Sequence, residues 1–336
     1  MKFQKEINIG KKKISKESSV YFVAEIGFNF LNNINLAYEM ISAAKEALAD
    51  AVKFQSFIAD KIVLPSHSFY EMFKKYELSK ENHFKIKEYC DKIGIEFFTT
   101  PFDTDTLDFI VDELKVNVIK IASGDLTFYP LLLKAAKTKL PIILATGLAT
   151  YKEIENSLRL IKKYNDKIIL LHCVSNYPLE YKNANLAVIK KLRKMFNCLV
   201  GFSDHSAGYM LDVIAVSLGA KLIEKHFTIN KNLENADNKI SMEPAEFKKM
   251  VTEVREIEQA IGNSENKPIV EELEMKKIAR RSIYTAQPIL ENEKITFDKI
   301  KIVRPYVEDS EPMQLTKILN KKAKKNYQKD EVIFTK

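Results

Sequence analysis

The sequence predicts a TIM (β/α)8 barrel followed by a small β-rich domain. Short apolar runs typical of buried strands alternate with longer stretches of helical periodicity, and this pair repeats eight times. The repeats occupy residues 1–265, close to the roughly 250 residues that eight strand-and-helix units need. The composition then changes to a charged helix and short β-like segments, which indicates a second domain.

Each expected strand is short and apolar, and each is followed by a stretch with apolar residues at helical spacing. The strands are expected at residues 20–27, 50–56, 95–102, 116–125, 140–147, 167–175, 198–206 and 220–228. The helices are expected at residues 35–49, 81–94, 103–114, 129–137, 151–164, 184–196, 208–219 and 244–262. In a TIM barrel the catalytic groups lie where strands run into the following loops, so a site is expected at the strand ends.

The boundary of the barrel is indicated by the segment "GNSENKP" at residues 262–268, which has the composition of a linker. We predict a barrel over residues 1–265, a linker helix over 266–281 and a small domain over 282–336. The small domain is too short to form a ligand pocket of its own.

The overall composition is that of a globular protein, with 336 residues of which 46% are hydrophobic and 29% charged. The net charge of +8, from 53 Lys and Arg against 45 Asp and Glu, is spread along the chain. This distribution argues against a nucleic-acid partner and suits a small anionic substrate. No apolar run approaches the roughly 20 residues of a membrane span, so no membrane association is expected.

The expected compartment is the cytoplasm, because the charged N-terminus lacks the apolar core of a signal peptide. Cys90, Cys173 and Cys198 are odd in number and lack metal-type spacing, so they are predicted to be buried thiols in a reducing compartment.

The expected strands all end in polar or ionisable residues. A single polar residue at a strand end is commonly a solvated cap, but here all eight strands end in such residues. Because an ionic group buried without a partner costs several kcal/mol, a ring of them at one barrel mouth implies a charged or metallic ligand. In order, the strand ends carry Glu25; Lys53 and Gln55; Thr99 and Thr100; Lys120, Ser123 and Asp125; Thr146; Ser175 and Asn176; Ser203, Asp204 and His205; and Lys225 and His226.

Two histidines, His205 and His226, end the adjacent seventh and eighth strands at matching depth. Their rings can reach one ion at about 2.1 Å, and such a site suits a borderline divalent ion such as Mn²⁺, Fe²⁺, Co²⁺ or Zn²⁺. The alternative is that His226 is a barrel residue satisfied by hydrogen bonds, as is expected of His172. His67 and His83 are expected at the surface.

Two lysines, Lys53 and Lys120, end the second and fourth strands, and Ser123, Ser203 and Lys225 are expected in the same ring. Cations and hydroxyls together suit a small ligand that carries both a phosphate and a carboxylate. A single inward lysine can instead form a Schiff base with a carbonyl substrate, as in class I aldolases. Several cations favour anion binding, and imine formation on Lys120 stays open as the alternative.

Nine segments of the chain together resemble the sialic acid synthase family, the phosphoenolpyruvate-dependent synthases of N-acetylneuraminate, legionaminate and pseudaminate. They are "FVAEIGFNF", "ADAVKFQSF", "FFTTPFD", "VIKIASGD", "ATGLA", "VGFSDHS", "LGAKLIEKHFT" and the C-terminal "ARRSIYTAQPI" with "KIVRP". The resemblance extends over nearly the whole chain, and the order and spacing of the motifs are highly specific. It implies an antifreeze-protein-like (SAF) C-terminal domain and condensation of phosphoenolpyruvate with an N-acylated amino-hexose, giving a nonulosonic acid and phosphate.

The resemblance also implies roles by position. His205 and His226 match metal ligands, with Mn²⁺ preferred and Mg²⁺ or Co²⁺ as alternatives. The catalytic groups are expected to be Glu25, Asp237, Lys53 and Lys120. Substrate contacts are expected from Gln55, Thr100, Ser123, Asp125, Thr146, Ser175, Tyr177, Ser203, Lys225 and Arg304. Arg304 matches an arginine donated by the partner's small domain in a swapped homodimer.

The chain departs from the family pattern mainly on the sugar side. Phe30 and Leu31 stand where the family has polar residues, which predicts an apolar pocket wall and a deoxygenated or further acylated acceptor. The alternative is that Phe30 turns into the barrel packing or a dimer contact and never meets the sugar. Asp125 and Ala145 replace a glutamate and a serine. Three hypotheses stay open here: the condensing enzyme, the Schiff-base aldolase on Lys120, and a non-catalytic sugar-binding relative.

Overall fold

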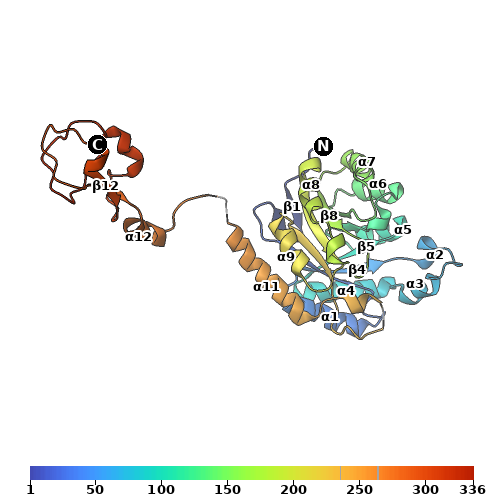
Figure 1. Cartoon of the computed structure of the whole chain (residues 1–336). Helices are drawn as coiled ribbons and strands as arrows, with labels where there is room; N and C mark the ends of the chain where they lie inside the picture. Colours follow the sequence, from blue (N-terminus) through green and yellow to red (C-terminus); the bar gives the residue numbers. More distant parts are fainter. Residues whose placement is uncertain (235, 263–264) are drawn as a thin grey trace. The chain divides into compact units, whose positions relative to one another are not determined.

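The structure is a computed structural model that describes residues 1–234, 236–262 and 265–336. The chain divides into two compact units, Met1–Gly262 and Asn263–Lys336. In the first unit, helices surround a barrel of parallel strands (Figure 1). This unit confirms the predicted TIM barrel.

The barrel strands follow each other in the order β5-β4-β3-β10-β9-β8-β7-β6 among the described residues. The end members β5 and β6 also lie against each other, so the sheet nearly closes. The strands are β3 (Tyr21–Gly27), β4 (Ala51–Ser56), β5 (Glu96–Pro101), β6 (Ile119–Ile121), β7 (Ile142–Ala145), β8 (Ile168–Cys173), β9 (Leu199–Asp204) and β10 (Leu222–His226).

Helices connect the strands and cover the outside of the barrel. Thr150 and Glu153 show how the sequence starts one of them: Thr150 Oγ1 accepts a hydrogen bond from the Glu153 amide at 3.3 Å, and Glu153 accepts one from the Thr150 amide at 2.7 Å. The segment 57–79, for which no regular structure was expected, contains two short helices. The helices are α1 (Ile34–Glu46), α2 (Ala59–Ile62), α3 (Tyr70–Tyr76), α4 (Lys80–Ile93), α5 (Thr104–Asp108), α6 (Tyr129–Lys137), α7 (Tyr151–Lys162), α8 (Ala187–Phe196), α9 (Met210–Ser217), α10 (Ala236–Ile240) and α11 (Pro244–Ile261).

The inside of the barrel is built in layers. One buried cluster spans more than one of these layers and contains Tyr21, Val23, Ala51, Phe98, Val118, Ile143, Ile169, Leu171, Leu199 and Leu222. Because strand side chains alternate between the two faces, the residues two positions after an inward residue also face inward. This step leads from Val23 to Glu25, from Ala51 to Lys53 and from Leu222 to Glu224, so the layer at the carboxyl ends of the strands is charged.

The N-terminal residues form a hairpin that the sequence analysis did not identify. Strands β1 (Glu6–Ile9) and β2 (Lys12–Ser15) pair antiparallel, and the side chains of β1 alternate between exposed and buried. Ile7, Ile9 and Ile14 belong to the same buried cluster as the inner layer of the barrel. The hairpin therefore closes the barrel at the amino ends of its strands and leaves the carboxyl ends as the mouth.

The second unit has a hydrophobic core of its own, which includes Ile283, Ile289, Ile300 and Ile333. Strands β11 (Ser282–Thr285) and β12 (Ile300–Val303) pair antiparallel, and α12 (Val270–Ala279) belongs to the same unit, where the Lys277 carbonyl accepts the Tyr306 amide at 3.0 Å. A small β-rich domain is thus confirmed. Of the helices described, none has the length and apolar character needed to cross a membrane.

Candidate active site

A ring of buried polar side chains lies at the carboxyl ends of the barrel strands. Its members come from six strands, and each has less than a tenth of its surface exposed. They are Glu25 of β3, Lys53 of β4, Thr100 of β5, Lys120 of β6, Ser203 of β9 and Glu224 of β10. Five of these six residues, all except Glu224, were expected at the mouth.

The first part of the ring is centred on Lys53. Its Nζ lies 2.7 Å from Glu25 Oε2 and donates to Thr100 Oγ1 at 3.1 Å. Gln55 Nε2 donates to the other oxygen of Glu25 at 3.0 Å. Gly27 makes this contact possible, since it has a φ of +56° and a Cβ there would lie 3.2 Å from Gln55 Nε2.

The second part of the ring is centred on Glu224, which the sequence analysis did not single out. Its Oε1 lies 3.1 Å from Lys120 Nζ and accepts a hydrogen bond from Ser203 Oγ at 3.0 Å, while its Oε2 lies 3.9 Å from Lys53 Nζ. Burial opposes the charge on Glu224, but Lys120 and Lys53 outweigh it and lower the pKa to about 2. Burial likewise opposes the charge on Lys53, yet Glu224 and Glu25 raise its pKa.

A cradle of small polar groups lies beside Lys120. A Cβ on Gly147 would come within 2.7 Å of Ser175 Oγ and within 2.8 Å of both Cys173 Sγ and Ser123 Oγ. Ser123 Oγ accepts the Gly147 amide at 3.1 Å and lies 2.9 Å from Cys173 Sγ. Hydroxyls and an amide around a glycine, next to a lysine, are suited to holding phosphate oxygens.

Asp125 follows the cradle at the end of a short turn, η2 (Ser123–Asp125). It is half-buried, and burial raises the pKa of its carboxyl group to about 6. Its Oδ2 is buried and makes no hydrogen bond within the described residues. Such a carboxyl group is poised to accept or release a proton near neutral pH.

His205 and His226 lie at the mouth with ring centroids 5.6 Å apart. The Nδ1 of His205 lies 2.8 Å from the Val174 carbonyl, which only accepts, so Nδ1 carries the proton and Nε2 keeps its lone pair. Tyr177 Oη lies 3.1 Å from that Nε2. Burial lowers the pKa of His205 to about 4, so its ring is neutral at physiological pH, as a metal ligand must be.

The residues present fit a divalent metal with an open coordination sphere. His226 Nδ1 is buried and has no hydrogen-bond partner among the described residues, which is an unusual state for a polar atom. Among all the residues that the structure describes, no group of three or more His, Cys, Asp or Glu side chains is arranged so that it could hold a metal ion. The protein would therefore supply two nitrogen ligands, and substrate and water would complete the sphere.

Neither Lys225 nor Thr146 is part of the ring, and for Lys225 the prediction that it faces the mouth is wrong. Lys225 points to the opposite face of β10 and forms an ion pair with Asp204. Thr146 Oγ1 donates to the Leu171 carbonyl at 2.9 Å. Lys225 lies between Glu224 and His226, and strand alternation sends it to the opposite side.

Two other predicted site residues lie outside the barrel strands. Asp237 lies in α10, and its charge is one of those that act on Tyr177. Arg304 is exposed in the second unit, after β12. All three cysteines are buried and free, as predicted.

Among the remaining histidines, His172 is satisfied as predicted, with its Nε2 2.8 Å from the Ala184 carbonyl, and His67 is exposed. The prediction for His83 is wrong, because it is 3% exposed and its Nε2 lies 2.6 Å from Ser56 Oγ.

Phe30 does not line the mouth. It is 2% exposed, belongs to the core between barrel and helices, and its ring lies 5.5 Å from that of Phe54, on the outer face of β4. The expectation of an apolar sugar-pocket wall at Phe30 is therefore wrong, and the alternative of barrel packing is confirmed.

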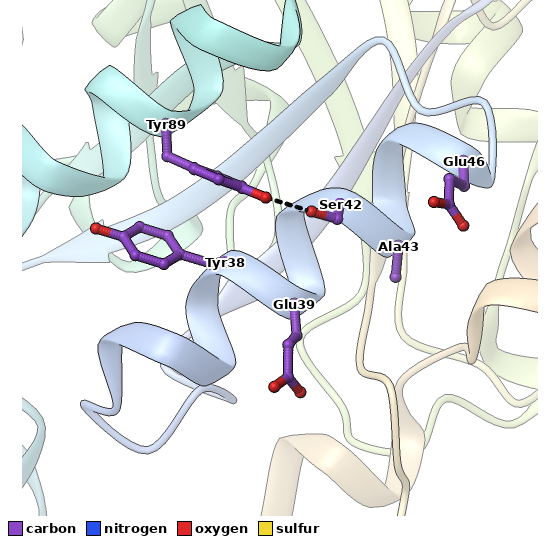
Figure 2. Close-up of a pocket in the computed structure, with 6 residues that line it drawn as sticks. All are labelled: Tyr38, Glu39, Ser42, Ala43, Glu46 and Tyr89. Atoms are coloured by element: carbon purple, nitrogen blue, oxygen red, sulfur yellow. Dashed lines mark hydrogen bonds between the residues drawn. The ribbon is translucent and has the colours of Figure 1, made fainter.

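A second concave surface lies on the side of the barrel, not at the mouth. It is an open groove of about 340 Å³ between α1 and α4, lined by Tyr38, Glu39, Ser42, Ala43, Glu46 and Tyr89. In Figure 2 the Tyr89 hydroxyl points to Ser42, and the two oxygens lie 2.8 Å apart. Nothing in this groove resembles the charged ring.

A nearly closed barrel that gathers its buried charges at the carboxyl ends of the strands has the arrangement of a TIM-barrel enzyme. Comparison with known proteins specifies the class. The family model named NeuB family matches residues 40–266. An N,N'-diacetyllegionaminic acid synthase of Legionella pneumophila is 38% identical over 304 residues, which are 85% of each chain.

Two further similarities extend along the chain. An uncharacterised protein of Methanocaldococcus jannaschii is 41% identical over 330 residues, which are 98% of this chain and 97% of that one. The crystal structure of N-acetylneuraminic acid synthetase from Leptospira borgpetersenii, with citrate, matches with a TM-score of 0.78 and 37% identity over 82% of this chain and 96% of that one. The chain belongs to the NeuB family, and it is a carbon–carbon bond-forming enzyme of the nonulosonic acid synthase type.

Proposed function

We propose that this enzyme condenses phosphoenolpyruvate with an N-acylated, mannosamine-like amino-hexose to give a nonulosonic acid and phosphate. The observation that carries the proposal is the ring in which Lys53 and Lys120 lie on either side of Glu224. Two fixed cations beside the Ser123–Gly147–Ser175 cradle suit a ligand that bears both a carboxylate and a phosphate. The names of the relatives, which are sialic-type acid synthases, support the same substrates.

The proposed roles of the residues follow from their positions. Lys53, Thr100 and Ser203 would hold the carboxylate, while Lys120, Ser123 and Ser175 would hold the phosphate. Gln55, Tyr177 and Arg304 would contact the sugar. Asp125 lies beside the phosphate cradle, where its raised pKa would let it exchange a proton.

The proposed reaction joins C3 of phosphoenolpyruvate to the aldehyde carbon of the open-chain sugar. The aldehyde oxygen takes up a proton, a water adds to C2, and the tetrahedral intermediate expels phosphate by breaking the C2–O bond. Glu25 and Asp237 are the carboxyl groups proposed to handle these protons. The rigid ion pairs of Glu25 and Glu224 keep the lysines in place before substrate binds, which limits the reorganisation needed.

A divalent metal, Mn²⁺ by preference and Mg²⁺ or Co²⁺ as alternatives, is proposed to bind His205 and His226. When bound, it would act as a Lewis acid on the aldehyde of the acceptor. Support comes from His205 Nε2, which keeps its lone pair and meets the Tyr177 hydroxyl at 3.1 Å, and from the unpartnered Nδ1 of His226.

We further propose a cytoplasmic homodimer in which the SAF domain of one chain closes the mouth of its partner and supplies Arg304. Support comes from apolar side chains exposed on loops that follow barrel strands, namely Phe69, Leu148, Tyr177 and Tyr181. In a free monomer these side chains would stay in water, whereas a partner domain would cover them.

The test is phosphate release from phosphoenolpyruvate, measured with purified enzyme, Mn²⁺ and a panel of acceptors. The panel contains N-acetylmannosamine and its 6-deoxy, 4-acylamino analogues, and kcat/KM is compared among them. Acceptor-dependent release of phosphate, with a nonulosonic acid detected by mass, is expected for at least one sugar. Phosphate release at the same rate with and without an acceptor, or no phosphate release with any sugar of the panel, would contradict the proposal.

A further inference from the structure

A buried ion pair lies behind the two histidines, on the outer face of the barrel strands. Lys225 of β10 and Asp204 of β9 stand directly opposite each other in the parallel ladder. Their side chains form an ion pair and are 1% and 0% exposed. Neither side chain reaches the mouth, so the proposed reaction has no use for them as substrate contacts.

The contacts of this pair hold the backbone on both sides of His205. Lys225 Nζ donates to the Ser206 carbonyl at 2.7 Å. Asp204 Oδ1 accepts the Ser206 amide at 2.8 Å, and its Oδ2 accepts the Ser206 hydroxyl at 2.9 Å. His205 lies between Asp204 and Ser206, and both of these neighbours are bound to Lys225.

The same lysine is also joined to the second histidine, because His226 follows Lys225 in β10. The two rings lie 5.6 Å apart, on adjacent strands. Their separation therefore depends on how the end of β9 is held against the end of β10. Lys225, Asp204 and Ser206 form the connection between these ends on the outer face.

Stability alone does not account for this arrangement. A buried ion pair is often no more stabilising than apolar residues of the same volume, because both ions lose their hydration. A third acid, Asp212 of α9, lies 3.9 Å from Lys225 Nζ, and burial and the neighbouring Asp204 raise the pKa of Asp212 well above its usual range. Burial and Asp204 thus disfavour a second charge at Asp212, and the close ion pair is the one between Lys225 and Asp204, as a fixed geometric role requires.

We propose that Lys225 and Asp204 are positioning residues that set the distance between His205 and His226 and so tune metal affinity. This inference rests on the proposed metal site. Residues that orient metal ligands from outside typically change metal affinity by about 10- to 100-fold when they are replaced. A change in metal affinity of this size is expected when Lys225 or Asp204 is replaced, although both histidine ligands remain in place.

The experiment measures Mn²⁺ binding to the substrate-free protein by titration calorimetry and by the electron paramagnetic resonance of free Mn²⁺. Lys225→Met and Asp204→Asn are expected to raise the Kd by roughly 10- to 100-fold, and Ser206→Ala, which removes one hydrogen bond, by a smaller factor. Circular dichroism and thermal unfolding establish that each variant is folded at the temperature of measurement. If Lys225→Met and Asp204→Asn do not fold, the Kd of Ser206→Ala for Mn²⁺ tests the inference instead.

The matched control is Asp50→Asn. Asp50 is also a buried carboxylate, paired with Lys12 and accepting the Phe22 amide at 2.7 Å, but it lies at the amino ends of the strands. It is expected to lose stability and keep the wild-type Kd. Wild-type affinity in the Lys225, Asp204 and Ser206 variants would overturn the inference, as would an equal loss in the control. Failure of the wild-type protein to bind Mn²⁺, or undiminished binding by His205→Ala, would instead contradict the proposed metal site.

Discussion

Lys120 Nζ and Glu224 Oε1 lie 3.1 Å apart, although they belong to strands β6 and β10, which are not neighbours in the sheet. The pair therefore crosses the inside of the barrel, where neither side chain is more than 6% exposed. Glu224 also faces Lys53, so one carboxylate separates two lysines that would otherwise repel each other. This carboxylate keeps both cations in place while the site is free of substrate.

Glu224→Gln tests the stabilising part of this relationship. The folded-state pKa of about 2 lies below the usual value of 4.5, so ionised Glu224 stabilises the fold above pH 4.5. That contribution is about 3 kcal/mol, and it fades as the pH falls from 4.5 towards 2. Urea unfolding should show the full difference between wild type and Glu224→Gln at pH 7 and a smaller one at pH 4. A difference that grows on acidification would contradict this assignment.

Lys120→Met tests anion binding against imine formation. We expect kcat/KM for phosphoenolpyruvate to fall by roughly 10- to 150-fold, which is the equivalent of about 1.5 to 3 kcal/mol for a hydrogen bond to a charged group. Borohydride added with pyruvate or phosphoenolpyruvate should leave the mass of the wild-type chain unchanged, because Lys120 is paired with Glu224 as a cation. A stable adduct that disappears in Lys120→Met would establish the Schiff-base alternative.

His205→Ala and His226→Ala test the metal. Each variant is expected to remain folded, because each histidine lies at the mouth, and to lose Mn²⁺ binding and turnover together. Exhaustive chelation of the wild-type enzyme should likewise stop phosphate release, and added Mn²⁺ should restore it. His172→Ala is the control, since His172 is bonded to the Ala184 carbonyl on the outer face of β8. Full activity after chelation would exclude a metal requirement.

The barrel could be predicted from the sequence because eight buried strands and amphipathic helices leave a strong periodic signal. The side to which each strand-end residue points was harder to predict. All five residues of β10, Leu222–His226, are buried, so hydrophobicity does not distinguish the inner face from the outer one. Counting by twos from His226 would have placed Glu224 at the mouth and Lys225 behind it.

The N-terminal hairpin was missed for a different reason. Its strands have four residues each, and Ile7, Ile9 and Ile14 are the apolar residues in them, among polar and charged neighbours. In so short a segment the apolar residues do not stand out from the lysines around them. Only the open end of the barrel, which needs a cover, gives these three isoleucines a place to be buried.

Phe30→Ala tests the corrected role of that residue. Removal of a buried phenylalanine ring costs about 3 to 5 kcal/mol, so the free energy of unfolding should fall by that amount. The ratio of kcat/KM between acceptors should stay unchanged below the unfolding temperature, because Phe30 packs against Phe54 away from the mouth. Gln55→Ala, which alters the ring itself, is the contrasting variant and should change the KM for the acceptor. A changed ratio of kcat/KM between acceptors in Phe30→Ala would instead indicate that this side chain contacts the sugar.

Mixing two inactive variants tests the proposed exchange of domains between subunits. In a swapped homodimer, one active site combines the barrel of one chain with Arg304 of the other. An Arg304→Ala chain and a Lys53→Ala chain should each be inactive or nearly so, since each damages both sites of its own homodimer. A hybrid dimer carries both changes at one site and neither at the other, so random mixing at equal amounts should restore about a quarter of the wild-type activity.

The control for this experiment is a mixture of Lys53→Ala and Lys120→Ala chains, in which both changes affect the barrel and every site stays damaged. Activity from the first mixture and none from the second would support the exchange, whereas two inactive mixtures, with subunit exchange demonstrated by mass, would rule it out.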